Sequence, residues 1–192
     1  MTIPLKGNWR FGVAYDVHTT DSVHLSVEDD RSEVWGSNRT EMGQLLYDLK
    51  YEGTRSKADR IVELLDGIEG LEGLDLIVPA PSSNFNRAFQ PVVEIARALG
   101  VRREMPMIED LLYKDCEGEE IKNVDDLKER GRLLRDAIHL NKKHDVAGKR
   151  VLLVDDLYRS GATLTVATEV LYHSAGVRDV YVLAMTKTRS RK

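Results

Sequence analysis

The chain contains little cysteine and no long apolar run. Cys116 is the only cysteine among its 192 residues, which excludes a disulfide within one chain and a zinc site built from cysteines. No segment approaches the roughly 20 apolar residues that a membrane-spanning helix needs. The first residues also lack the apolar stretch of a signal peptide. These absences predict a cytoplasmic protein that has no membrane partner.

An excess of positive charge is missing too. The 28 basic and 32 acidic side chains give a formal net charge of -4, so the chain has no overall attraction to nucleic acid or to an anionic membrane. Direct binding of nucleic acid is not expected, although the basic run at residues 187–192 leaves DNA contact open as an alternative to a solvated terminus. A content of 42% hydrophobic and 31% charged residues is typical of one globular domain.

The hydrophobic pattern changes along the chain. Residues 1–39 form a β-rich segment, for which we expect a small antiparallel hairpin or meander. Thr40 and Gly53 predict the start and end of an amphipathic helix, and residues 58–65 predict a second one. Short apolar strands then alternate with helices, which favours an α/β fold with a mostly parallel central sheet flanked by helices. We expect residues 40–192 to form one domain, with the N-terminal segment in the same compact unit.

Four strands and three helices are expected in the second part of the chain. The strands cover residues 74–78, 104–108, 150–154 and 179–185. The helices cover residues 90–99, 125–140 and 163–174. Residues 113–123 are polar and lack a period, so we predict a mobile loop there.

The residues that carry chemistry follow the third of these strands. Asp155 and Asp156 come directly after four apolar residues, and Arg-Ser-Gly-Ala-Thr at 159–163 leads into the last helix. Ligands of open parallel sheets bind at this carboxyl edge. Gly161 allows close backbone approach, and the N–H groups at a helix start can hold a phosphate.

The two acids narrow the choice of ligand. A carboxylate about 4 Å from a phosphate charge costs on the order of 4 kcal/mol at an effective dielectric near 20. Asp155 and Asp156 are therefore expected to meet sugar hydroxyls, or a Mg²⁺ ion that bridges those hydroxyls to a pyrophosphate. The whole motif predicts a site for a ribose 5-phosphate unit.

Residues 151–164, Val-Leu-Leu-Val-Asp-Asp-Leu-Tyr-Arg-Ser-Gly-Ala-Thr-Leu, resemble the phosphoribosyl pyrophosphate (PRPP) signature of type I phosphoribosyltransferases. From about residue 40 to 186, the chain resembles the ComF-like, amidophosphoribosyltransferase-like branch of that superfamily. The segments that carry this wider resemblance are 49–53, 77–81, 85–89 and 127–138. The resemblance implies a phosphoribosyltransferase that binds PRPP with Mg²⁺ and transfers the phosphoribosyl group to a nitrogen nucleophile, releasing pyrophosphate. It also implies that a homodimer is one possible assembly.

The resemblance assigns roles to particular residues. Asp155 and Asp156 would bind the ribose hydroxyls as the catalytic pair and would help to hold Mg²⁺, directly or indirectly. The loop for the 5′-phosphate would be Arg159, Ser160, Gly161, Ala162 and Thr163. The pyrophosphate loop would be Ala80, Pro81, Ser82 and Ser83. Further candidates are Arg87, Lys50 and Tyr158, where Tyr158 would stack on a base or anchor the loop. Residues 113–123 would belong to a loop that closes over the site.

Three departures from the family pattern keep other interpretations open. The N-terminus lacks a cysteine-rich zinc element, Arg159 takes the first place of a loop that usually reads Thr-Thr-Gly, and residues 80–83 contain no basic residue. The alternative is a non-catalytic accessory protein of the ComF type that binds PRPP or a nucleotide and is linked to DNA handling. An acidic pair after an apolar strand also occurs in receiver domains, but there it follows an N-terminal strand and the glycine loop is absent. The acids and the turn could also simply cap a helix, without binding a ligand. The five histidines show no metal-ligand spacing, so we expect surface or packing roles for them.

Overall fold

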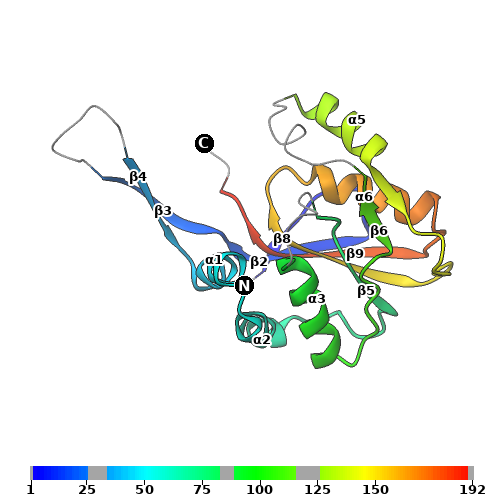
Figure 1. Cartoon of the computed structure of the whole chain (residues 1–192), viewed down its shortest axis with the longest axis horizontal. Helices are drawn as coiled ribbons and strands as arrows, with labels where there is room; N and C mark the ends of the chain where they lie inside the picture. Colours follow the sequence, from blue (N-terminus) through cyan, green and yellow to red (C-terminus); the bar gives the residue numbers. More distant parts are fainter. Residues whose placement is uncertain (1, 26–33, 83–88, 116–125, 190–192) are drawn as a thin grey trace.

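The computed structural model describes residues 2–25, 34–82, 89–115 and 126–189. Its centre is a five-stranded sheet in the order β1-β2-β9-β8-β5 (Figure 1). The strands are β1 Ile3–Pro4, β2 Phe11–Val17, β5 Leu76–Pro79, β8 Arg150–Tyr158 and β9 Asp179–Lys187. Four of them run parallel, and only β1 is antiparallel, to β2. The predicted α/β fold with a mostly parallel sheet is confirmed.

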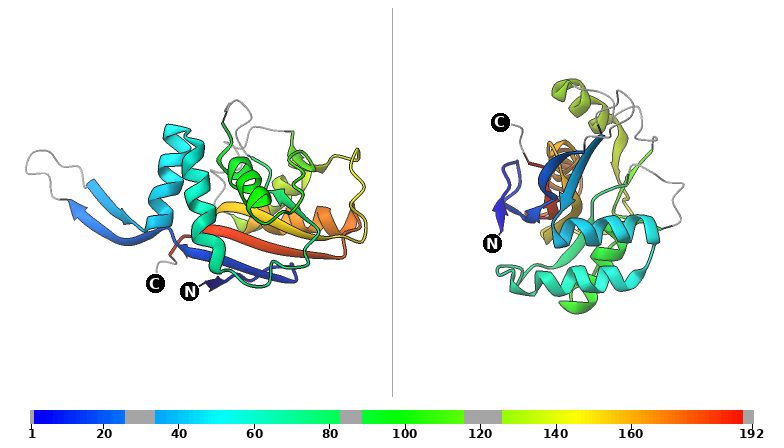
Figure 2. Two further views of the ribbon diagram at one scale, coloured as in Figure 1. Left: turned by 90° about the horizontal axis from the view of Figure 1, so that it is seen from below. Right: turned by 90° about the vertical axis from the view of Figure 1, so that its left-hand side faces the viewer.

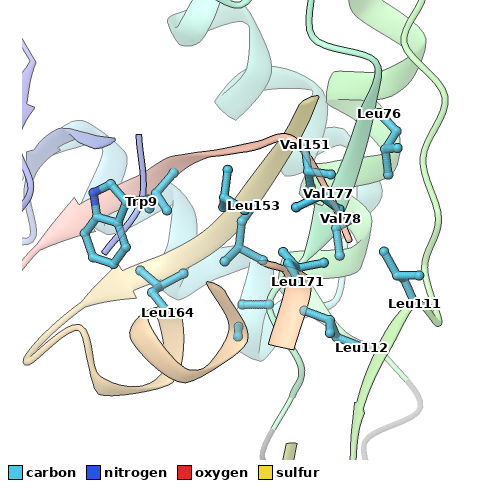
Figure 3. Close-up of a cluster of buried hydrophobic side chains, with 14 of the residues drawn as sticks. Trp9, Leu76, Val78, Leu111, Leu112, Val151, Leu153, Leu164, Leu171 and Val177 are labelled. Atoms are coloured by element: carbon cyan, nitrogen blue, oxygen red, sulfur yellow. The ribbon is translucent and has the colours of Figure 1, made fainter. Parts of the chain in front are cut away.

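Helices cover both faces of this sheet, which explains why its strands are continuous apolar runs. Helices α1, α2 and α3 lie on one face, and α6 lies on the other with α5 outside it (Figures 1 and 2). Side chains of β8 alternate between the faces, because Val151 and Leu153 pack toward α6, whereas Leu152 and Val154 pack toward the other helices. Figure 3 shows the cluster on the α6 face. The helices are α1 Glu41–Glu52, α2 Arg55–Leu64, α3 Pro91–Arg102, α5 Leu127–Ala137 and α6 Ala162–His173, with a 3-10 turn η1 at Leu65–Gly67.

Local sequence signals account for the ends of α1. The Thr40 hydroxyl accepts a hydrogen bond from the N–H of Gly43 at 3.1 Å, as an N-cap does. At the other end Gly53 adopts a left-handed conformation with φ of 66°, which glycine reaches without strain. Both predicted boundaries of this helix are confirmed. No helix in the described part of the chain is long and apolar enough to cross a membrane.

The N-terminal region is divided between a hairpin and the central sheet. Strands β3 (Thr19–Leu25) and β4 (Val34–Arg39) form an antiparallel hairpin that projects away from the sheet (Figures 1 and 2). Strand β2, by contrast, pairs in parallel with β9 from Phe11 to Val17. A hairpin was predicted here, but the parallel pairing of β2 with the far end of the chain was not.

Three local predictions were wrong. Residues 104–108 form only an isolated bridge, between Met107 and Ile77, because Pro106 has no N–H to donate and Glu104 has a positive φ of 50°. The predicted helix over 125–140 ends at Ala137 and gives way to strand β7 (Ile138–Leu140). This strand pairs with β6 (Leu112–Lys114), so residues 113 and 114 belong to a strand and not to a loop. Residues 116–123 of the predicted loop lie outside the described residues.

Candidate functional site

Asp155 and Asp156 lie in the last part of β8, at the carboxyl edge of the sheet. The Asp156 N–H donates to the Asp155 carboxylate at 2.9 Å. Burial, and then the negative charge of Asp156, raise the pKa of Asp155 well above its ordinary value. No ion pair of the described residues includes either carboxylate. The pair is therefore electrostatically strained and gains from a ligand that supplies donors or positive charge.

The turn from β8 into α6 has the geometry of an anion site. Gly161 stands at the N-cap with φ of 75°, a conformation that favours glycine. The N–H groups of the first turn of α6 have no carbonyl partner within the helix, and that of Ala162 makes only a long contact of 3.4 Å with the Ser160 hydroxyl. The positive end of the helix dipole lies at the same place. Backbone and dipole together can hold a phosphate here.

A cavity of about 70 Å³ lies over this turn and is bounded by Asp155 as well. It is several times larger than the minimum space for one water molecule, which is roughly 10–15 Å³. Its remaining lining residues come from the end of β8 and the start of α6: Leu157, Tyr158, Arg159, Ser160, Gly161, Ala162, Thr163 and Leu164. Larger hollows of about 400 and 420 Å³ lie at the amino edge of the sheet and between α2 and α3, and neither is lined by the acidic pair or by the Gly161 turn. Of these three hollows, the small cavity is the one that joins phosphate donors to a carboxylate.

Tyr158 closes one side of the turn. Its ring lies so near Gly161 that a Cβ there would approach ring atoms to 2.7 Å. The Tyr158 hydroxyl donates to the Lys6 carbonyl at 3.3 Å, and Trp9 packs edge-on against the ring with centroids 6.4 Å apart. Of the two roles considered for Tyr158, these contacts describe the loop anchor.

The predicted pyrophosphate loop begins beside the acids. Pro79 of β5 pairs with Val154 of β8, and the Ala80 N–H donates to the Val154 carbonyl at 2.8 Å. Ala80 and Pro81 are buried and Ser82 is partly exposed. Ser83 and Arg87 lie outside the described residues.

A lysine that sequence reasoning missed lies near Asp155. Lys114 is only 5% exposed, and it follows the buried Leu112 by two residues, with the exposed Tyr113 between them. Leu112 belongs to the same buried cluster as Ala80, and Lys114 lies on the same side of β6 as Leu112. Its charge acts to lower the pKa of Asp155, although burial outweighs it. The packing of β6 thus provides a cation that residues 80–83 lack.

A second group of basic residues lies around His18, near Asp156. His18 follows β2 directly, and its ring Nδ1 lies 3.1 Å from the Thr186 hydroxyl. Burial, and then the charge of Arg39, lower the pKa of His18; Lys50 acts in the same direction, and Asp156 opposes them. The structure brings the predicted Lys50 into this region, whereas His18 and Arg39 were missed because only the pairing of β2 and of the hairpin places them here.

The acidic pair also fits a magnesium ion. Carboxylate oxygens are the hard ligands that Mg²⁺ prefers, and a cation bound there would offset the burial and the repulsion that raise the pKa of Asp155. No group of three or more His, Cys, Asp or Glu side chains in the described part of the chain could hold a metal ion. Substrate oxygens and water would have to complete the coordination, as is usual for Mg²⁺ bound with phosphates.

The comparison with solved structures found phosphoribosyltransferases among its matches. Adenine phosphoribosyltransferase from Thermoanaerobacter pseudethanolicus shares 14% identity over 80% of this chain and 88% of that chain, with a TM-score of 0.41. Hypoxanthine phosphoribosyl transferase from Trypanosoma cruzi shares 14% identity over 70% of this chain and 65% of that chain, with a TM-score of 0.41. A search of curated proteins found no match.

A family model gives the assignment. The model of the phosphoribosyl transferase domain matches residues 86–191, which is more than half of the 192 residues. The matched region contains the acidic pair, the turn at Gly161 and all of α6. The chain therefore belongs to the phosphoribosyl transferase domain family.

Proposed function

We propose that this protein transfers the phosphoribosyl group of PRPP to a nitrogen nucleophile and releases pyrophosphate. One observation carries the proposal: the cavity at the start of α6 is bounded both by the Gly161 turn and by Asp155. A ribose 5-phosphate could thus place its phosphate on the backbone donors and its hydroxyls toward the carboxylates. The family to which the chain belongs supports the same chemistry.

Each part of the site would have one task. Residues 159–163 would anchor the 5′-phosphate, and Asp155 and Asp156 would orient the ribose through its hydroxyls. Residues 80–83 would receive the pyrophosphate, with Lys114 as a nearby positive charge. As the bond from C1 to the pyrophosphate oxygen breaks, the sugar gains positive charge, and the neighbouring carboxylates stabilise it. A Mg²⁺ held by the acidic pair would neutralise negative charge on the leaving group.

We further propose that the chain belongs to the ComF-like branch. The segments at 49–53 and 77–81 that resemble this branch lie in α1 and at the end of β5, beside the site. In this interpretation the basic group of His18, Arg39 and Lys50 faces the acceptor side of Asp156, and Lys114 faces the pyrophosphate side of Asp155.

Calorimetric titration with PRPP and Mg²⁺ tests the function directly. We expect the wild type to bind, and the double variant Asp155→Asn/Asp156→Asn to lose most of the affinity for PRPP while it keeps part of the affinity for inorganic phosphate. Asp179→Asn is the matched control, because Asp179 starts β9 at the opposite edge of the sheet. Absence of binding to the wild type, or equal binding to the double variant, would refute the proposal.

Pyrophosphate release then separates an enzyme from a binding protein. The assay combines PRPP and Mg²⁺ with a panel of purine and pyrimidine bases and with ammonia. Release that depends on one of these acceptors is the expected result. Tight binding of PRPP without any release would instead select the non-catalytic accessory role.

A further inference from the structure

His18 lies at the carboxyl edge of the sheet, directly after β2, and has no role in the proposed binding of PRPP. Its backbone N–H donates to the Lys187 carbonyl at 2.9 Å, which holds it beside the end of β9. Its ring is partly buried, and Nδ1 lies 3.1 Å from the hydroxyl of Thr186. One hydrogen bond therefore fixes the backbone of His18, and a second one fixes its imidazole ring.

The hydrogen bonds of Thr186 determine which ring nitrogen carries the proton. Thr186 is fully buried, and its hydroxyl donates to the carbonyl oxygen of Asp156 at 3.2 Å. A hydroxyl has only one proton to donate, so in its contact with His18 it must accept. The Nδ1 atom of His18 is therefore the donor. In the neutral ring this leaves Nε2 with a free lone pair.

The charges around the ring favour the neutral form. Burial and the cations Arg39 of β4 and Lys50 of α1 lower the pKa of His18, while Asp156 of β8 acts in the opposite direction. Lys187 of β9 contacts His18 through its backbone carbonyl, whereas its ammonium lies 5.6 Å from the centre of the Tyr158 ring. Within the described residues, no hydrogen bond engages Nε2. A neutral imidazole with an unoccupied acceptor atom can take up a proton.

We propose that Nε2 of His18 is the base that accepts the proton of the acceptor nitrogen during phosphoribosyl transfer. The acceptor nitrogen forms a bond to C1 of the ribose while the bond from C1 to the pyrophosphate oxygen breaks. The electron pair of the broken bond leaves with pyrophosphate, and the proton of the nitrogen passes to Nε2. The acceptor is therefore a compound with an N–H group that must be lost on transfer. This inference rests on the proposed function.

The tautomer can be measured without a substrate. Nitrogen-15 chemical shifts of the His18 ring, assigned by comparison with His18→Gln, report which nitrogen is protonated. We expect a proton on Nδ1 in the wild type and a loss of that preference in Thr186→Val. A ring protonated on Nε2 at neutral pH overturns the inference.

The chemical role is measured by separating binding from turnover. His18→Gln should bind PRPP with wild-type affinity but release pyrophosphate about 100-fold more slowly with the best acceptor. Added imidazole should restore part of the rate to His18→Ala, which a merely structural role would not explain. His173→Gln, at the exposed last turn of α6, is the matched control and should behave as wild type.

The outcomes distinguish this inference from the proposed function. If the wild type does not bind PRPP, both fail. If the wild type binds PRPP and turns it over, but His18→Gln does so at the same rate, only the role of His18 is refuted. If PRPP is bound and neither a base nor ammonia causes release, there is no transfer, and the role of His18 is refuted as well.

Discussion

Replacing Asp155 by asparagine should stabilise the folded protein at neutral pH while it removes PRPP binding. The reason is the position of this carboxyl, which is partly buried and next to Asp156. Asparagine keeps an oxygen that can accept the hydrogen bond from the Asp156 N–H, now 2.9 Å long, but it carries no charge. The variant therefore removes repulsion without leaving that donor unpaired.

The size of the effect follows from the repulsion between the two carboxylates. Two unit charges about 4 Å apart repel by about 4 kcal/mol at an effective dielectric near 20. Hydration at the partly exposed edge of the sheet reduces this value, so we expect a gain of about 1–2 kcal/mol. For a chain of this length the gain corresponds to a rise in Tm of about 2–8 °C.

The pH dependence of this gain is the sharper test. A carboxyl whose pKa is raised on folding binds protons more tightly in the folded chain, so its ionisation costs stability as pH rises above the ordinary value of 3.8. The difference in Tm between Asp155→Asn and wild type should therefore grow from pH 4 to pH 8. Differential scanning calorimetry across this range measures it. A lower Tm for the variant at pH 8, or a difference that does not change with pH, would refute the reasoning.

Asp75 provides a control of opposite sign. Its carboxylate accepts the N–H of Arg150 at 2.6 Å at the start of β8, and this hydrogen bond lowers the pKa of Asp75. A carboxyl whose pKa is lowered on folding stabilises the folded chain at pH values above its ordinary pKa, and this contribution is lost as pH falls through the folded pKa. Asp75→Asn should therefore lower Tm at neutral pH, and the difference should shrink in acid.

Three further predictions concern the packing of the site. Gly161→Ala should cost more stability than Gly148→Ala. Both glycines have a positive φ, of 75° and 71°, but of the two only Gly161 would bring a Cβ within 4 Å of other atoms. Thermal melts of both variants measure the difference, and phosphate titration of Gly161→Ala measures its effect on the turn. Lys114→Met should weaken pyrophosphate binding about tenfold and Lys114→Arg much less, as measured by calorimetry. Equal binding by the wild type and both variants would show that the charge of Lys114 does not attract pyrophosphate. Thr168→Val should stabilise the fold by about 1 kcal/mol, because the buried Thr168 hydroxyl has no partner among the described residues. Thr186→Val should destabilise the fold by about 1–3 kcal/mol, because the Thr186 hydroxyl makes two hydrogen bonds. Urea unfolding measures both changes.

Elements set by local sequence could be predicted well. Helix α1 begins and ends where Thr40 and Gly53 predict, because a side-chain cap and a left-handed glycine act within one turn. Strand β8 was recognised as a continuous apolar run, since both of its faces are covered. The acidic pair lies in the last part of that strand and the glycine turn follows it, so their place at the carboxyl edge followed from the strand.

Features that depend on distant pairing could not be predicted in the same way. Ile138–Leu140 continues a helical pattern, but pairing with β6 makes it a strand. This pairing also buries Lys114, which lies in a polar stretch of the sequence. His18 likewise reaches the site only because β2 runs parallel to β9, more than 160 residues away in the chain. Neither Lys114 nor His18 carries a motif, and only their spatial neighbours indicate a role.

The N-terminal residues support the site from two sides. Trp9 and the Lys6 carbonyl hold Tyr158 against the Gly161 turn from behind. Strand β2 then runs parallel to β9 and ends at Val17, and His18 follows it, close to Asp156. The usual family loop has small residues where this chain has Arg159, and the anchored tyrosine gives the backbone of that turn a fixed position even though Arg159 itself is exposed. Because the anchor and the histidine come from one continuous segment, residues 6–18 position both the Gly161 turn and the surroundings of Asp156.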